Sequence, residues 1–86
     1  MLTPQVGKAD EDRLRKESEG RIQRVEQLLA ALGQRRLGTE DRETQDTIKD
    51  FIAKAKDALA SQDLLRAASL SEKAQVLADD LVSRLK

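Results

Sequence analysis

The chain has 86 residues, and its sixteen basic and sixteen acidic side chains leave no formal net charge. Because it contains no Cys, disulfides are excluded, and the joint absence of Cys and His argues against a zinc or other metal site. Without His, Cys or Tyr, the usual general base, nucleophile and proton donor are missing, so we expect neither an enzyme nor a bound cofactor. The balanced charge gives no general attraction to nucleic acid or to an anionic membrane.

Residues 1–8 contain the only Pro of the chain, and we expect them to form a flexible lead. They lack the hydrophobic core of a signal peptide, and no apolar run reaches the length of a membrane span. We therefore expect a soluble protein, and its compartment stays open between the cytoplasm and, if a signal segment preceding this sequence has been removed, the bacterial cell envelope. Residues 9–86 are predicted to form a single helical domain.

The first predicted helix spans residues 10–32. Its first half is almost entirely charged, and Leu14 is the one apolar side chain there. The second half is amphipathic, because five apolar residues recur at the spacing of one helical face. These are Ile22, Val25, Leu28, Leu29 and Leu32. Gly33 follows, and we expect it to end the helix in a left-handed conformation.

The second predicted helix spans residues 40–60. Thr39 is expected to cap it, and Glu40 and Asp41 complement the positive end of the helix. One face carries an apolar stripe made of Ile48, Phe51, Ile52, Ala55, Ala58 and Leu59. The link to the next helix is so short that the two helices must run antiparallel.

The third predicted helix spans residues 63–85, with Asp63 as its N-cap. Its apolar stripe has the alternating spacing of three and four that is typical of coiled-coil seams, in Ala67, Leu70, Ala74, Leu77, Ala78, Leu81 and Leu85. Leu65 and Val76 lie off this stripe but close to each other on the helical wheel. We predict that these two residues contact either the first helix or a partner chain.

Three amphipathic helices of similar length predict an all-α, up-down-up three-helix bundle, the simplest arrangement that buries all three stripes. The alternative is a helical hairpin of residues 39–85 that dimerises through its apolar faces. In that case the first helix swaps or points elsewhere. A chain of this size buries only about 60% of the surface its unfolded form exposes, so a second copy would add stability.

The hairpin formed by the second and third helices resembles a single tetratricopeptide repeat. Phe51, Ala55 and Ala58 match the large-small-small pattern of that family's first helix, and Ala67 and Ala74 match the two small positions of its second. The sequence departs from the family at the turn, where Gln62 stands in place of Gly, and no second copy of the repeat follows. The hairpin is also similar to helical hairpins of bacterial envelope proteins. Both resemblances imply a role in binding or assembly.

No motif for catalysis or metal binding is present. The neighbouring Asp79 and Asp80 point about 100° apart on a helix, so they cannot share a ligand and are expected to be solvated. We therefore predict a non-enzymatic protein–protein interaction or assembly module that binds a partner protein or a second copy of itself. The alternative is a nucleic-acid-associated helical protein whose basic patch would consist of Arg21, Arg24, Arg35 and Arg36.

Overall fold

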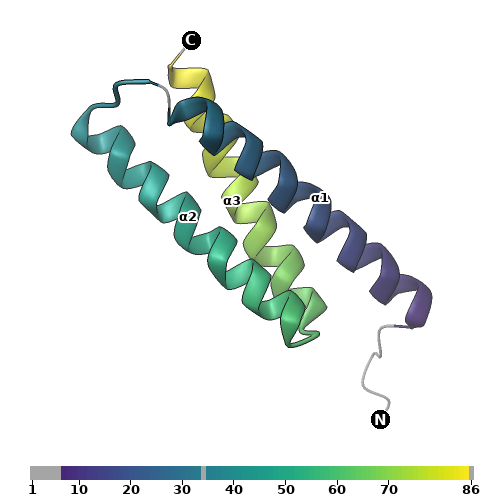
Figure 1. Cartoon of the computed structure of the whole chain (residues 1–86). Helices are drawn as coiled ribbons and strands as arrows, with labels where there is room; N and C mark the ends of the chain where they lie inside the picture. Colours follow the sequence, from purple (N-terminus) through teal and green to yellow (C-terminus); the bar gives the residue numbers. More distant parts are fainter. Residues whose placement is uncertain (1–6, 34, 86) are drawn as a thin grey trace.

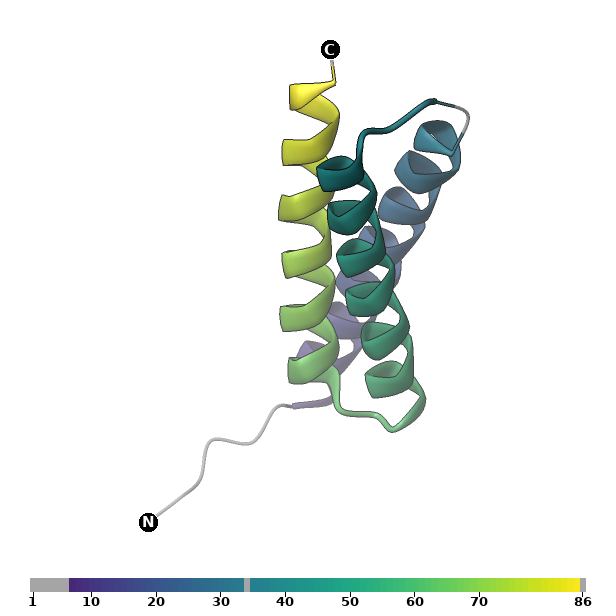
Figure 2. The same ribbon diagram turned by 90° about the vertical axis from the view of Figure 1, so that its left-hand side faces the viewer.

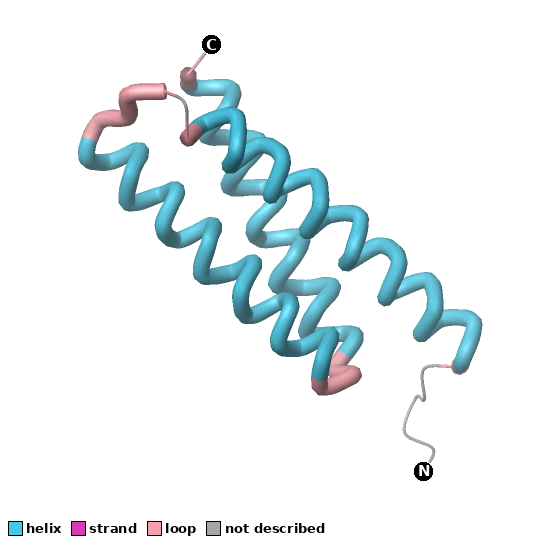
Figure 3. Tube along the Cα trace, viewed as in Figure 1, coloured by secondary structure: helices cyan, strands magenta, loops and turns pink. Residues whose placement is uncertain are grey.

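The computed structural model describes residues 7–33 and 35–85, and the regular elements in this part of the chain are three helices (Figures 1 and 3). They are α1 (Lys8–Leu32), α2 (Thr39–Ala60) and α3 (Leu64–Arg84). The helices run up, down and up, and no strand occurs in the described ranges. The predicted all-α three-helix fold is therefore confirmed.

α3 is the central helix of the bundle. It packs along both other helices, whereas α1 and α2 contact each other only over a short stretch. Figure 2 shows α1 running obliquely to the pair formed by α2 and α3. One direct link between the outer helices is the ion pair in which Lys56 Nζ lies 2.6 Å from Glu26 Oε2. The apolar side of α3 thus packs against both α1 and α2.

The core is made from the predicted stripes of all three helices. Its fully buried centre includes Ile48 of α2, Val25 of α1 and Leu81 of α3. Small side chains such as Ala74 and Ala78 let the helices approach closely, while larger ones at the edges are only partly buried. The partly buried residues packed on the core are Leu28, Leu29, Phe51, Leu59, Leu70, Leu77, Val82 and Leu85. The helical period of the apolar residues therefore identified the faces that pack.

The start of the chain differs slightly from the prediction. Residues 1–6 of the predicted flexible lead lie outside the described residues. Gly7 is the N-cap of α1 and lies outside the helix, whereas Lys8 already belongs to it, so α1 begins two residues before the predicted start at residue 10. The backbone N–H of Glu11 donates to the carbonyl of Gly7 at 2.8 Å, which closes the first turn. Asp10 and Glu11 favour this early start because acidic side chains complement the positive end of a helix.

Of the predicted helix ends, the Asp63 cap is confirmed, the Thr39 cap is wrong, and Gly33 ends its helix without the predicted left-handed conformation. The Asp63 carboxylate accepts from the backbone N–H of Arg66 at 3.3 Å. Thr39 is not a cap, because α2 already begins there and Gly38 occupies the cap position without a side-chain hydrogen bond. Gly33 follows the last residue of α1 as predicted, but it keeps right-handed torsion angles, φ −61° and ψ −15°, and its N–H donates to the Leu29 carbonyl.

The left-handed residue in the described part of the chain is Gln62, with φ 59°. It follows the end of α2 in a Schellman motif, in which the N–H of Asp63 donates to the Ala58 carbonyl at 2.8 Å and that of Gln62 to the Leu59 carbonyl at 3.0 Å. This position normally holds Gly, since a side chain is strained there. Gln62 therefore makes the tight turn from α2 to α3 at some cost in stability.

Candidate functional site

Leu65 and Val76 lie on the side of α3 that is turned away from the core, and each is 62% exposed. They are eleven residues apart, which is about 16 Å along the helix axis. Ser69 and Glu72, both exposed, lie between them on the same ridge. The two predicted contact residues are therefore accessible, but polar side chains separate them.

Val76 lines an open groove of about 440 Å³ between α2 and α3, which we call the α2–α3 groove. Phe51, Val76 and Leu77 supply its apolar lining, and Ser69, Glu72 and Lys73 supply polar groups. The complete set of lining residues is Phe51, Ser69, Glu72, Lys73, Val76 and Leu77. The volume falls within the range of roughly 300–1,000 Å³ that is common for ligand sites.

Phe51, the only aromatic residue of the chain, lines this groove. The adjacent residue, Ile52, is buried in the core, whereas Phe51 is only partly buried and packs against the core from the flank of α2. The sequence pattern placed both residues in one apolar stripe. The pattern could not distinguish them, because it does not show which edge of the stripe a third helix covers. Phe51 and Leu77 are thus the groove residues that the prediction assigned to the core alone.

Leu65 lies in a different environment from Val76. It lines a smaller hollow of about 170 Å³, where the beginning of α1 approaches the turn between α2 and α3. The other lining residues there are Glu11, Gln62, Asp63 and Leu64. Leu65 and Val76 therefore share a helix ridge without sharing a binding site.

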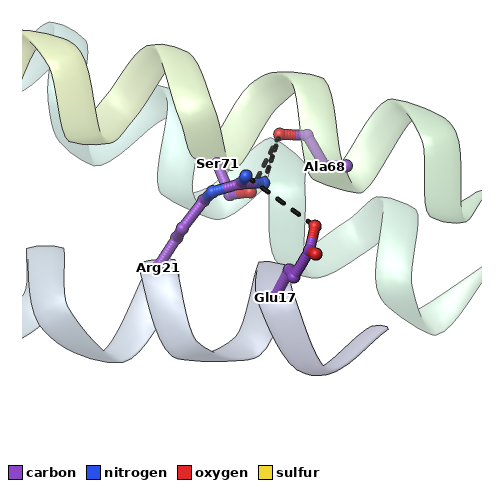
Figure 4. Close-up of polar contacts among 4 residues, drawn as sticks. All are labelled: Glu17, Arg21, Ala68 and Ser71. Atoms are coloured by element: carbon purple, nitrogen blue, oxygen red, sulfur yellow. Dashed lines mark hydrogen bonds and ion pairs between the residues drawn. The ribbon is translucent and has the colours of Figure 1, made fainter. Parts of the chain in front are cut away.

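Arg21 and Arg24, two members of the predicted basic patch, lie on α1 where it packs against α3. Arg24 Nη2 lies 3.6 Å from Asp79 Oδ1 on α3. Arg21 donates from Nη1 to the Ala68 carbonyl at 3.4 Å, and its Nη2 lies 3.9 Å from Glu17 Oε2 (Figure 4). Both guanidinium groups are thus engaged in holding α1 on α3.

Two serines on the helices that pack here are fully buried, and their burial was not predicted from the sequence. Ser71 of α3 is fully buried and donates from Oγ to the same Ala68 carbonyl at 3.0 Å (Figure 4). This is the local hydrogen bond expected for a Ser within a helix. Ser18 of α1 is also fully buried, and its Oγ has no hydrogen-bond partner among the described residues. The contact between α1 and α3 therefore contains polar groups as well as apolar ones.

Arg35 and Arg36, the other two members of the predicted patch, lie beyond the end of α1. Arg24 lies about 12 Å along the helix axis from Leu32, the last residue of α1, and Arg35 comes after that end. Arg35 donates from Nη1 to the carbonyl of Leu85 at 3.0 Å, which ties the loop to the C-terminal end of α3. The four arginines therefore form two separate pairs, and the nucleic-acid alternative stays a prediction.

The adjacent aspartates of α3 are each paired with a different arginine. Asp79 contacts Arg24, whereas Asp80 Oδ2 lies 3.4 Å from Nε of Arg84. Among the described residues, no group of three or more acidic, His or Cys side chains is placed to hold a metal ion. Asp79 thus pairs with α1, whereas Asp80 pairs with the next turn of α3 itself, and the two carboxylates share no ligand position.

Comparisons of the chain with protein-family models, with curated proteins and with solved structures returned no match. The resemblance to the tetratricopeptide family therefore stays a prediction that depends on the residues of the hairpin. Within the part of the chain that the structure describes, no helix combines the length and the apolar composition needed to cross a membrane.

Proposed function

We propose that this chain is a non-enzymatic protein–protein interaction module that binds through the α2–α3 groove. The observation that carries the proposal is the position of Phe51, the only aromatic residue, which lines an open groove beside an exposed Val76. Aromatic side chains are enriched in interfaces, because they bury a large area and lose little conformational entropy. The apolar lining of this groove offers a partner a place to bury an apolar side chain of its own.

The occupant that suits this groove is an amphipathic helix. Helix-in-groove recognition uses apolar anchors at intervals of three and four residues, which match a channel between two antiparallel helices. Glu72 and Lys73 line the groove with opposite charges, so a partner that carries both signs would be oriented in one direction. A second copy of this chain and an unrelated helical protein both satisfy these requirements.

The exposed apolar area supports weak rather than permanent association. In the described residues, the large apolar side chains with high exposure are Leu65 and Val76, and they are three helical turns apart. A stable interface usually buries about 800 Å² on each partner, much more than two separate side chains supply. We therefore expect binding in the micromolar range or weaker, as is common for transient interactions.

A helical peptide library displayed on phage tests this proposal. The immobilised chain selects peptides while the Val76→Glu variant competes in solution, so that only groove-dependent peptides are enriched. We expect the selected peptides to share apolar residues at i, i+3 or i+4 and to bind the Val76→Glu variant roughly tenfold more weakly. The matched control is Ala53→Glu, an exposed position on α2 outside the groove, which should leave binding unchanged.

Equal binding of the selected peptides to both variants, or no enrichment at all, would argue against the groove as the binding site. Self-association is tested separately by sedimentation equilibrium at rising protein concentration. A mass that increases for the native chain and for Ala53→Glu, but not for Val76→Glu, would identify the second copy as the partner. A constant monomer mass would leave a different protein as the partner.

A further inference from the structure

In contrast to the apolar α2–α3 groove, a polar and basic pocket lies where the chain passes from α1 to α2. It has a volume of about 240 Å³, and we call it the loop pocket. Its polar lining includes two arginines of the loop, one arginine from the first turns of α2 and one glutamine amide. Its lining consists of Leu32, Gly33, Arg35, Arg36, Leu37, Arg42 and Gln45. None of these described lining residues is acidic.

The charge in the loop pocket is only partly balanced. Arg35 donates one N–H to the Leu85 carbonyl at the negative end of α3, which fixes its guanidinium group at the pocket. Arg36 and Arg42 take part in no ion pair with a described residue. Asp41, which is adjacent to Arg42, is directed to Arg84 at 4.0 Å instead. The pocket therefore concentrates positive charge in a chain whose overall charge is zero.

The side-chain hydrogen-bond groups of the pocket are all donors apart from the Gln45 amide oxygen. A guanidinium group carries five N–H groups and accepts none, and its planar fork matches the oxygen atoms of a phosphate in bidentate geometry. The Gln45 amide adds two further N–H groups. A ligand that satisfies such a set must supply several acceptor oxygens and negative charge, and a tetrahedral phosphate does both.

We propose that the loop pocket binds a phosphate group, either as inorganic phosphate or as the monoester of a small molecule. The volume lies below the roughly 300–1,000 Å³ of sites that enclose drug-sized ligands, so it suits a single small anionic group. Arg36 and Arg42 supply the main attraction, and Arg35 and Gln45 complete the coordination. This site is separate from the α2–α3 groove, and its occupancy does not depend on the proposed interaction function.

The test is a titration of the full ¹⁵N-labelled chain with sodium phosphate at constant ionic strength. Binding is monitored through the NMR signals of the backbone amides. NMR is suitable because the chain has no Trp or Tyr to report binding by fluorescence. We expect saturable shifts confined to the residues around the loop pocket. Arg36→Gln and Arg42→Gln should each weaken phosphate binding roughly tenfold, as expected for the loss of one charged hydrogen-bond donor.

The matched control is Arg13→Gln, an exposed arginine in the first half of α1 whose side chain is 66% exposed. It removes the same charge from the chain, so phosphate binding that responds only to net charge would weaken equally in all three variants. That result, or shifts that spread over the basic surface without saturation, would overturn the proposal. The fold of each variant is verified by the unchanged amide signals of α3.

Two further titrations identify the source of the phosphate group. Acetate at the same concentrations presents a carboxylate, and binding as tight as that of phosphate would overturn the assignment to phosphate. Phenyl phosphate presents a monoester with an organic group attached. Tighter binding of phenyl phosphate than of inorganic phosphate supports a small organic phosphate as the ligand, and the reverse order supports the free anion.

Discussion

The two helices that flank α3 are attached to it in different ways. α2 is joined to α3 by a tight turn, and its buried residues Ile48, Ile52, Ala55 and Ala58 are all apolar. α1 has no buried residue before Ser18, and this first buried residue is polar. The α2–α3 hairpin is thus a continuous apolar contact, whereas α1 is held mainly by its second half.

This contrast indicates how stability is distributed over the chain. Regions with few buried apolar contacts open at a lower free energy than the core around them. The exposed, charged beginning of α1 has few buried apolar contacts, whereas the buried stripe that runs along α3 is part of the core. We therefore expect α1 to open before the hairpin does, although all three helices share one core.

The largest expected effect comes from Ile48→Ala in the hairpin. Ile48 is fully buried, so the substitution leaves a cavity and should lower the free energy of unfolding by about 2–5 kcal/mol. For a domain this small, such a loss approaches the whole stability. Urea denaturation followed by far-UV circular dichroism measures it, with Lys49→Ala as the exposed neighbouring control. Equal, small effects of the two substitutions would contradict the proposed core of the hairpin.

Val25→Ala tests how α1 is attached to the hairpin. Val25 is fully buried on α1, and the loss of its two methyl groups should cost about 1–3 kcal/mol. If α1 opens separately, the amides of α1 should lose protection from hydrogen exchange more than those of α2 and α3. An equal loss of protection in all three helices would show that the chain opens as one unit, against the contrast drawn above.

Much of the fold could be predicted from the sequence, because the period of the apolar residues alone indicates which face of a helix packs. All three predicted stripes lie in the core or against it. The burial of Ser18 and Ser71 was not predicted, because the stripes were defined by apolar residues alone. Their spacing carried a signal, since Ser18 precedes Ile22 by four residues and Ser71 precedes Ala74 by three, as members of the same stripes do.

The candidate sites were less predictable, because they depend on how the helices are placed. The position of Leu65 and Val76 off the apolar stripe followed from the helical wheel. Whether the first helix covers them did not follow, and neither did the participation of Phe51 in the groove. Likewise, Arg35 and Arg36 were predicted as members of a basic patch with Arg21 and Arg24. Arg42 joins them only because the path of the chain brings the first turns of α2 to the same pocket.

Arg21→Ala should have an intermediate effect, because Arg21 is a polar link between α1 and α3. Its hydrogen bond to the Ala68 carbonyl is long and only partly buried, so we expect a loss of about 1 kcal/mol. Arg13→Ala is the control, since the ion pair of Arg13 with Asp10 is exposed and lies within α1. Chemical denaturation of both variants measures the difference. A loss of the same size in Arg13→Ala would assign the effect to the charge rather than to the link.

The smallest expected effect concerns the turn that joins the hairpin. Gln62→Gly should stabilise the chain by about 0.5–1 kcal/mol, because the relief of the left-handed strain exceeds the added entropy of Gly in the unfolded chain. The adjacent Ser61→Gly is a matched control, since Ser61 has a φ of −87° and gains nothing from Gly. It should therefore lower stability by a few tenths of a kcal/mol. Thermal denaturation of the two variants should give midpoints that move in opposite directions, and a decrease in both would show that Gln62 stabilises the turn through its side chain.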